Sequence, residues 1–298
     1  MTPSFLRDTT LVARFEIAEA VRSKLLLVML LLFLGAGSLG AWGFTKAVQR
    51  IEQEASSVVP GVSVKIDRSS PLYRNLIQRF VHDPAKAEYF LSLPPIVFFY
   101  AWASLGFMPW LVLFLSAETI ASEVSSRGIR YSLLRTGRLP YALGKMAGQA
   151  VILAGAAAAA ALAYYAVSWK LLGGVEAGGI ARGMLCYWPL ILLHNLPFLA
   201  WALFASMATA SANLSRILSL GGAVVLAILS ALSGWSFLQR GPVSAGLWKL
   251  ASFLTPFGHA GGLEYPRGTP FWTDAATCLG LSLLYFGAGY ALLRRRDV

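Results

Sequence analysis

The residues best suited to chemistry lie in one polar segment, Glu118 to Lys145, between two long apolar runs. The segment contains two carboxylates, Glu118 and Glu123, and five basic side chains: Arg127, Arg130, Arg135, Arg138 and Lys145. Guanidinium and ammonium groups bind phosphates and carboxylates, and charged side chains are costly inside a lipid bilayer. The segment is therefore expected outside the membrane, against lipid phosphates or a partner protein.

Motifs for catalysis and nucleotide binding are missing. Gly144-Lys145 is followed by Met146, where a phosphate-binding loop needs a hydroxyl residue, and no strand precedes it. No HExxH occurs, and the three histidines, His82, His194 and His259, are far apart. We therefore predict no catalytic residue, no metal and no cofactor in this chain.

The residues needed by a membrane-embedded enzyme or by an ion-driven carrier are also missing from the sequence. The string AGSLG at 36–40 lacks the first glycine of a nucleophile elbow and lies in an apolar run, so a membrane-embedded enzyme has weak support. Carboxylates fall only near the ends of apolar runs, as Glu118 and Asp274 do, whereas an ion-driven carrier keeps one near the membrane midplane. The energy for any transport must come from elsewhere.

Composition indicates a membrane protein. Of the 298 residues, 57% are hydrophobic and 13% are charged, against about a quarter charged in soluble domains. The net charge of +11 comes from basic residues at the ends of apolar runs, which favours membrane topology over nucleic-acid binding. Cys186 and Cys278 lie in apolar runs and are expected to be small hydrophobic residues.

An all-α integral membrane protein is predicted, because a spanning helix needs about 20 apolar residues. Six segments qualify: 25–44, 93–117, 146–169, 184–212, 217–236 and 275–293. Pro189 and Pro197 favour a kink in the fourth, with a broken helix as the alternative. The density of Lys and Arg, clearest in Arg294–Arg296, places both termini in the cytoplasm. A signal peptide at 1–44 is the less favoured interpretation.

Three predicted pieces lie outside the spans. Residues 3–22, with Thr2 as a cap, form an interfacial helix or else a loosely ordered basic tail. The outer loop 45–92 contains a helix after Ser70-Pro71, whose apolar stripe rests on the membrane face or on a second copy of the loop. The outer loop 237–273 contains a re-entrant or interfacial helix around Trp248, which Pro256 and Gly258 end.

The polar segment should form a helical elbow. We expect the second spanning helix to continue through Glu118 and Glu123 to a break at Gly128, and a second helical stretch to run to Thr136. Another turn near Pro140 then leads into Lys145, at the foot of the third span. The alternative is a loop whose arginines only bind lipid phosphates.

The order of Glu123, Gly128, Leu133-Leu134 and Gly144-Lys145 resembles the first cytoplasmic loop of the permeases of type-2 ATP-binding-cassette exporters. The ending YALLRRRDV, the six spans, the N-terminal helix and the PFGHA string at 256–260 are similar to the same family. The resemblance thus covers nearly the whole chain. The long first outer loop is most similar to permeases of the nitrous-oxide-reductase-maturation and gliding-motility type.

The resemblance implies one transmembrane permease domain, 1–298, in a bacterial inner membrane. Two such permeases pair as a dimer and use two separate ATPase subunits, which hold the ATP and Mg. The loop 118–145 would dock on the ATPase, through Glu123, Gly128, Arg130, Leu133, Leu134, Arg135, Arg138 and Lys145. The fifth span, rich in small residues, would line the dimer seam.

The translocation pathway and the substrate are less constrained. Tyr100, Trp102 and Ser104 on the second span are candidates for lining the pathway, although packing explains them equally well. His194 and Asn195 are further candidates, with satisfaction inside the helix bundle as the favoured alternative. A different function remains open, in which a scaffold or assembly factor recruits a periplasmic or outer partner through loop 45–92 without transport.

Overall fold

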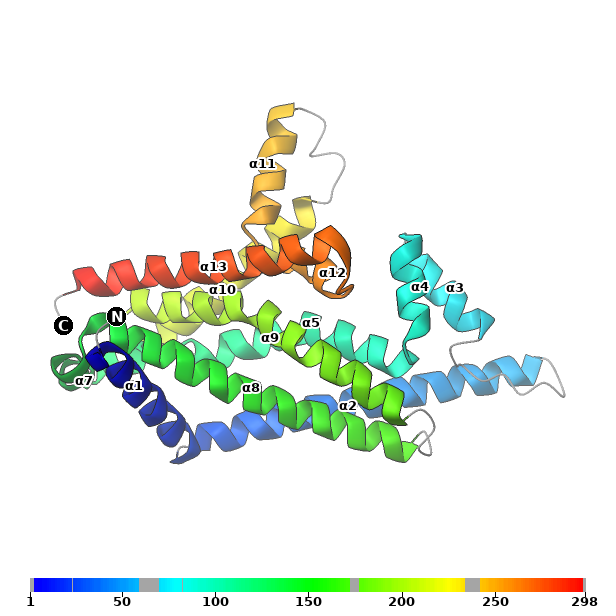
Figure 1. Ribbon diagram of the computed structural model, residues 1–298, viewed down its shortest axis with the longest axis horizontal. Helices are drawn as coiled ribbons and strands as arrows, with labels where there is room; N and C mark the ends of the chain where they lie inside the picture. Colours follow the sequence, from blue (N-terminus) through cyan, green and yellow to red (C-terminus); the bar gives the residue numbers. More distant parts are fainter. Residues whose placement is uncertain are drawn as a thin grey trace. The chain divides into compact units, whose positions relative to one another are not determined.

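The computed structural model describes residues 3–22, 24–58, 70–81, 83–171, 177–233 and 242–296. Most of these residues are helical, and no strand occurs among them. Their elements, in chain order, are α1 (Pro3–Arg22), α2 (Lys24–Val58), α3 (Pro71–Phe80), α4 (Pro84–Ser92), α5 (Pro95–Ser116), α6 (Ala121–Ser125), α7 (Ile129–Thr136), α8 (Arg138–Leu171), α9 (Ala177–Ala208), α10 (Ala212–Ser233), α11 (Pro242–Phe253), η1 (Pro256–His259), α12 (Ala260–Leu263) and α13 (Gly268–Arg295) (Figure 1).

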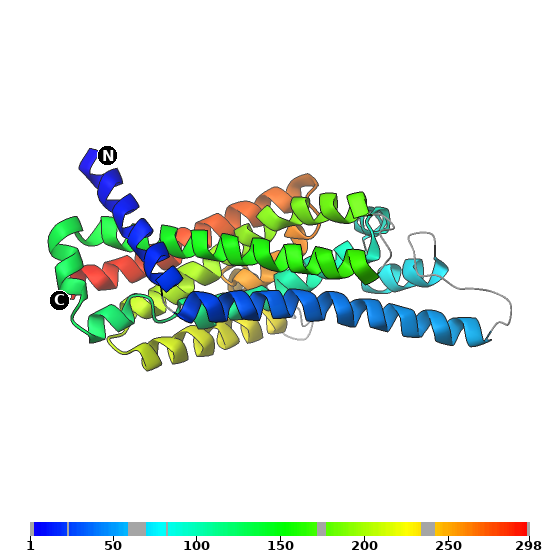
Figure 2. The ribbon, with the colours of Figure 1, turned by 90° about the horizontal axis from the view of Figure 1, so that it is seen from below.

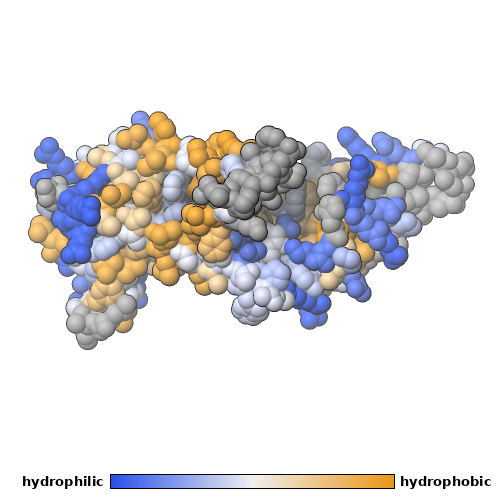
Figure 3. All heavy atoms as spheres, turned by 90° about the horizontal axis from the view of Figure 1, so that it is seen from above, coloured by the Kyte–Doolittle hydropathy of each residue, from blue (hydrophilic) through white to orange (hydrophobic). Residues whose placement is uncertain are grey.

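Six helices are long and apolar enough to cross a membrane: α2, α5, α8, α9, α10 and α13. The prediction of an all-α integral membrane protein is confirmed. Hydrophobic atoms are exposed over broad parts of the face drawn in Figure 3, as expected where lipid is the solvent. A soluble protein would have buried these side chains instead.

The predicted spans differ from the helices mainly at their ends. Helix α2 continues to Val58, so the predicted outer loop 45–92 begins inside a helix. Helix α9 passes through Pro189 and Pro197 without interruption and ends at Ala208, before the predicted end at 212. The cap at Thr2, the end of the fifth span at 234–236 and the tail at 297–298 lie outside the described residues.

The helices group into two compact units that alternate along the chain. One consists of Met1–Leu27, Leu105–Gly155 and Leu192–Val298, and the other of Val28–Ser104 and Ala156–Ile191. Helices α2, α5, α8 and α9 each contribute one part to each unit. The polar segment predicted to carry function lies wholly in the first unit.

In the second unit, α3 and α4 form a small helical pair. Asp83 caps α4, because its carboxylate accepts hydrogen bonds from the backbone N–H groups of Ala85 and Lys86. Buried Tyr73 and Ile77 of α3 pack with Ala87 and Phe90 of α4. The Tyr73 hydroxyl also donates to the Phe90 carbonyl, at 3.2 Å.

The stripe on the predicted helix of loop 45–92 therefore has a different partner from the one expected. Tyr73 and Ile77 rest on α4, a neighbour within the same loop, rather than on the membrane face or a second copy. For these two residues the prediction was wrong, because α4 was missed. The signal for α4 was present in Asp83-Pro84, a capping residue followed by proline at the first helical position.

In the first unit, α11, η1 and α12 form a short helical arm before α13, and α11 crosses α13 rather than running alongside it (Figure 1). His259, buried at the end of η1, holds this arm. Its Nδ1 lies 2.8 Å from Asp274 Oδ1 on α13, and its Nε2 lies 3.0 Å from the Phe253 carbonyl oxygen at the end of α11. The Tyr285 hydroxyl of α13 donates to the Leu254 carbonyl, at 2.7 Å.

Both partners of the His259 ring are acceptors, so both ring nitrogens donate when the imidazole is protonated. Burial lowers the pKa of His259, but the hydrogen bonds to Asp274 and Phe253 and the charge of Asp274 outweigh it, so the pKa is raised. The imidazolium thus ties α11 to α13. This contribution to stability is complete below the ordinary pKa of about 6.5 and is lost as the pH rises through the raised pKa of the folded state.

The attachment of α11 to α13 should therefore weaken with rising pH. Amide hydrogen exchange of residues 253–264, corrected for its intrinsic pH dependence, should accelerate above the raised pKa of His259. Asp274→Asn removes the carboxylate charge and should move this acceleration to lower pH. Glu88→Gln, an exposed carboxylate on α4, serves as the control. An identical pH profile for Asp274→Asn and the wild type would contradict the assignment.

Candidate functional site

The polar segment 118–145 folds into two short helices between α5 and α8. Helix α7 covers 129–136, as predicted, and Gly137, with φ of 76°, ends it in a conformation that favours glycine. However, α5 ends at Ser116 and the chain becomes α-helical again only at Ala121, in α6. The prediction of one continuous helix through Glu118 and Glu123 was therefore wrong.

Serine side chains from α9 and α10 explain this interruption. Ser206 Oγ of α9 accepts hydrogen bonds from the backbone N–H groups of Ile120 and Ala121, at 2.9 and 2.8 Å. Ser215 Oγ of α10 donates to the carbonyl of Ala117. Backbone groups that a continuous helix would pair internally are thus satisfied by neighbouring helices, which fixes the turn between α5 and α6.

Lys145 lies at the centre of a buried ion cluster at the foot of α8. Only 2% of Lys145 is exposed, and its Nζ forms ion pairs with Glu16 of α1 and Glu123 of α6. Gln149 Nε2, one turn along α8, donates to Glu16 Oε1 at 2.7 Å. The Tyr141 hydroxyl, one turn before Lys145, donates to Glu123 Oε2 at 2.8 Å.

The cluster joins four helices. Ser116, the last residue of α5, donates from its hydroxyl to Gln149 Oε1 at 3.2 Å, so α5 is linked to α8 and through Gln149 to Glu16 of α1. Burying a charge is costly unless it is paired and hydrogen-bonded, and here each buried charge has both kinds of partner. The cluster consequently specifies how α1, α5, α6 and α8 meet.

Two glycines allow α1 to approach α8 closely enough for these contacts. A Cβ atom at Gly144 would lie 2.5 Å from Val12 Cβ, and one at Gly148 would lie 2.7 Å from Glu16 Cβ. These distances are too short for any larger residue without displacing α1. The spacing Gly144-x-x-x-Gly148 therefore forms a flat strip on α8, a device that brings helices together in membranes. Figure 2 shows α1 lying across the start of α8.

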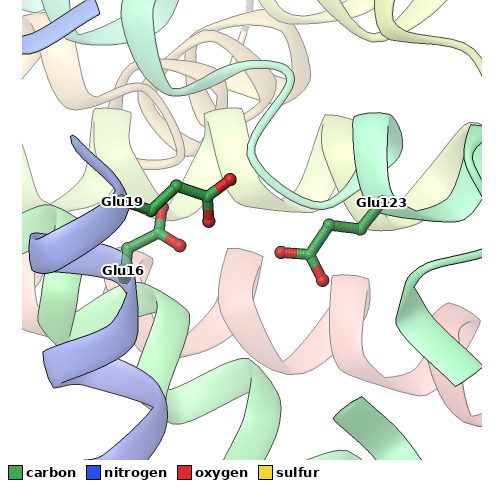
Figure 4. Close-up of side chains that lie close together, drawn as sticks. All are labelled: Glu16, Glu19 and Glu123. Carbon is green, nitrogen blue, oxygen red and sulfur yellow. The ribbon is translucent and has the colours of Figure 1, made fainter. Parts of the chain in front are cut away.

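Three carboxylates of this region could in principle hold a metal ion. Glu16 and Glu19 project from α1 and Glu123 from α6, and their oxygens lie within 4.8 Å of one another (Figure 4). Lys145 Nζ already contacts Glu16 and Glu123, so the lysine ammonium takes the place of the cation. Glu19 is exposed to solvent. The geometry fits a structural ion cluster.

The residues predicted for docking separate into two groups. Glu123 and Lys145 belong to the buried cluster. The Arg138 side chain donates to the carbonyls of Leu293, at 3.3 Å, and Arg294, at the end of α13. Arginine in this position satisfies carbonyls that a helix end leaves unpaired. These three residues anchor the segment within the chain.

The second group lies on α7 and faces away from the chain. Leu134 is 85% exposed, and Arg130 and Arg135 are also exposed. Tyr131, which sequence reasoning missed, is 78% exposed on the same face. Leu133 is half-buried, as is Gly128 in the turn before α7. Because Ile129 on the opposite face is fully buried, α7 is held on one side and free on the other.

Among the candidates for the translocation pathway, Tyr100 and Ser104 of α5 contact each other through a side-chain hydrogen bond. In the second unit, Tyr100 is buried against the ring of Tyr164, at a centroid distance of 5.2 Å, while Trp102 is 58% exposed and Ser104 half-buried. In the first unit, His194 and Asn195 are buried in α9. Their roles in a pathway remain predictions.

Sequence reasoning also missed the partners of Lys145. Glu16 was not among the residues predicted for the site, although it lies on the same face as Val12 and Ala20, one turn away on each side. Each glycine of the strip on α8 is followed by a polar residue, Lys145 or Gln149. An acidic residue on an apolar face of α1, together with this glycine spacing on α8, could have predicted the contact between Glu16 and Lys145.

Removing the cation from the buried cluster should destabilise the chain. Lys145→Met leaves Glu16 and Glu123 buried without a counter-charge, a change that costs about 3–5 kcal/mol in comparable buried pairs. The unfolding temperature in detergent should fall, and adding Glu16→Gln should restore part of it. Arg130→Met, at an exposed position on α7, should leave the temperature close to the wild-type value. Equal unfolding temperatures for Lys145→Met and wild type would refute the role of the cluster.

Comparison with known proteins gives a family for this chain. A search of curated proteins returned no match. A family model described as ABC-2 family transporter protein matches residues 10–298, which include all six membrane-spanning helices and the segment 118–145. The chain therefore belongs to the ABC-2 family of transporters, as a membrane-embedded permease subunit of an ABC transporter.

Proposed function

We propose that α7 is the coupling helix of this permease and docks in a groove of a separate ATPase subunit. The observation that carries the proposal is the outward face of α7. Leu134 and Tyr131 are 85% and 78% exposed, and Arg130 and Arg135 flank them. An exposed apolar centre with a charged rim is typical of a protein interface. A purely lipid-binding loop would need only the arginines.

The anchoring of this segment supports its use as a lever. Glu118, in the turn before α6, forms an ion pair with Arg216 of α10 at 2.6 Å. Ser219 of α10 donates to the Leu113 carbonyl of α5 at 3.1 Å. Arg138 links the start of α8 to the end of α13. A displacement of α7 would therefore act on α10, α8 and α13 together, because contacts on both sides of α7 reach these helices.

ATP hydrolysis would take place on the partner. The chain has no phosphate-binding loop, so the ATP and its Mg²⁺ would be bound by two ATPase subunits, one for each permease copy. The cytoplasmic side would be the one that carries α7 and the basic end of α13, Arg294 and Arg295, with both termini on that side. The membrane would be the plasma membrane, that is, the inner membrane, with α7 facing the cytoplasm.

A second copy of the permease would pack against α10. Leu214, Ile217, Val224, Val225 and Ile228 are exposed and follow one face of this helix. Gly221 lies in the middle of that face, and an added Cβ there would meet open space. A glycine within an apolar stripe allows two helices to approach closely, and a two-fold axis brings the same face of each copy together.

The segment between α2 and α5 supports the likeness to permeases of nitrous-oxide-reductase maturation and gliding motility. It contains the packed pair α3 and α4, which is more structure than a simple connection needs. A partner protein on the outer side would find a formed surface there. The substrate is left open by these observations.

Docking of the ATPase should depend on Leu134. Leu134→Asp places a charge at the centre of the proposed interface and should reduce the ATPase activity that co-purifies with the permease by about tenfold or more. Because Leu134 is exposed, the unfolding temperature should not change. Ser125→Asp adds the same charge at an exposed position of α6 and is the matched control. Full retention of the ATPase by Leu134→Asp would show that α7 is not the docking helix.

The proposed seam can be tested by cross-linking in native membranes. Val224→Cys, one turn from Gly221, should form a disulfide-linked dimer upon mild oxidation, in a background where the exposed Cys186 is replaced by serine. Leu283→Cys, on a similarly apolar and exposed part of α13, should remain monomeric under the same treatment. Dimers of the α13 variant in the absence of α10 dimers would place the seam elsewhere.

A further inference from the structure

Helix α5 crosses the membrane with a proline in its interior. Pro109 lies within the continuous helix Pro95–Ser116. Proline has no backbone N–H group, so the carbonyl four residues earlier, that of Leu105, loses its partner within the helix. Leu105 lies near the middle of α5, where little water reaches an unpaired carbonyl. A donor from another helix is therefore needed to satisfy this carbonyl.

His194 of α9 provides the donor. Its ring forms a hydrogen bond with the backbone carbonyl of Leu105. Only 1% of His194 is exposed, and its Nδ1 has no hydrogen-bond partner among the described residues, so Nε2 is the nitrogen that donates. The hydrogen bond that α5 lacks within its own backbone is thus supplied by a side chain of α9.

Aromatic packing fixes the orientation of the His194 ring. This ring stands edge-on to Phe198, one turn along α9, at a centroid distance of 5.3 Å. Phe198 packs edge-on against Phe257 of η1, at 4.7 Å. The ring of Phe257 lies 5.5 Å from that of Trp110, the residue after Pro109. Aromatic rings in such contacts leave His194 little freedom to turn away from α5.

The C-terminal end of α5, which leads into the segment that carries α7, is held in a similar way. The Leu113 carbonyl accepts a hydrogen bond from Ser219 of α10, at 3.1 Å. The Ala117 carbonyl, in the turn after α5, accepts one from Ser215 of the same helix. Together with the bond from His194, these contacts fix the direction in which α5 meets α6 and α7.

We propose that His194 is a positioning residue for energy coupling. Its Nε2–H group replaces the hydrogen bond that Pro109 removes from α5, and so keeps the two halves of this helix aligned. Without the bond, α5 would bend at Pro109 when a force acts on α7, and less of the movement would reach the rest of the helix. This role rests on the proposed docking of an ATPase on α7, whereas the replacement of the missing bond does not.

A double-mutant cycle in detergent tests the bond. His194→Met removes the donor and should lower the unfolding temperature by about 2–4 °C. Pro109→Ala restores a backbone N–H group for the Leu105 carbonyl, so His194→Met should cost little in that background. His194→Gln keeps an N–H donor of similar reach and should stay close to the wild type. The control is Ser282→Ala, which removes a buried bond to the Cys278 carbonyl of α13 and should cost the same in both backgrounds.

ATP hydrolysis by the permease purified with its ATPase tests the positioning role. His194→Met should retain the ATPase, because α7 is unchanged. Hydrolysis should nevertheless fall, by up to about tenfold for one lost hydrogen bond. Adding Pro109→Ala should restore the rate, when all variants are compared well below their unfolding temperatures. A loss of stability alone would not change the rate under these conditions.

Equal costs of His194→Met with and without Pro109→Ala would overturn the replacement of the bond. Undiminished hydrolysis by His194→Met would overturn the positioning role. If no ATPase co-purifies even with the wild type, the docking proposal and the coupling role both fail, while the unfolding cycle still decides whether the bond exists. Should His194→Met fail to fold, recovery upon adding Pro109→Ala supports the bond, and failure of the double variant as well overturns it.

Discussion

The close approach of α1 to α8 is the contact on which the arrangement around the polar segment depends. Gly144 and Gly148 remove the side chains that would separate the two helices. Only at this short distance can the carboxylate of Glu16 reach both Lys145 and Gln149. Steric fit and charge pairing support each other here, because neither the glycine strip nor the ion cluster would bring the other into place alone.

The contact between α1 and α8 also provides a rigid base for α6 and α7. The ion cluster fastens α6 to α1 and α8, while serines and an ion pair fasten the preceding turn to α9 and α10. Helix α7 extends from this anchored base with one face buried and the other exposed. A helix held in this way transmits a force applied to its free face instead of yielding to it. The proposed docking of an ATPase on α7 relies on that stiffness. Lys145, which was predicted from the sequence to contact the ATPase, is buried and contributes to the stiffness as part of the ion cluster.

Much of the fold could be predicted from sequence, because lipid imposes a simple requirement. A spanning helix must be long and apolar, and each predicted span falls within one helix apart from short ends such as 209–212. Helix α7 was predicted because Gly128 and Gly137 delimit it. The interruption between α5 and α6 could not be predicted, because it depends on Ser206 and Ser215, far along the chain. The separation of docking residues from anchoring residues was missed for the same reason: the partners of Arg138 lie on α13 and a partner of Lys145 lies on α1, both far away in the sequence.

The pairing of Glu16 with Lys145 also bears on how the chain is synthesised. The two residues are 129 positions apart, so α1 leaves the ribosome long before its partner on α8 exists. Until then Glu16 has no counter-charge within the cluster and must stay hydrated. The opposite face of α1 mixes exposed Leu11 and Phe15 with Arg14, which suits a helix that rests at the lipid headgroups during this interval. Docking of α1 would then be a late event of membrane insertion, completed only when the third spanning helix has been delivered to the bilayer.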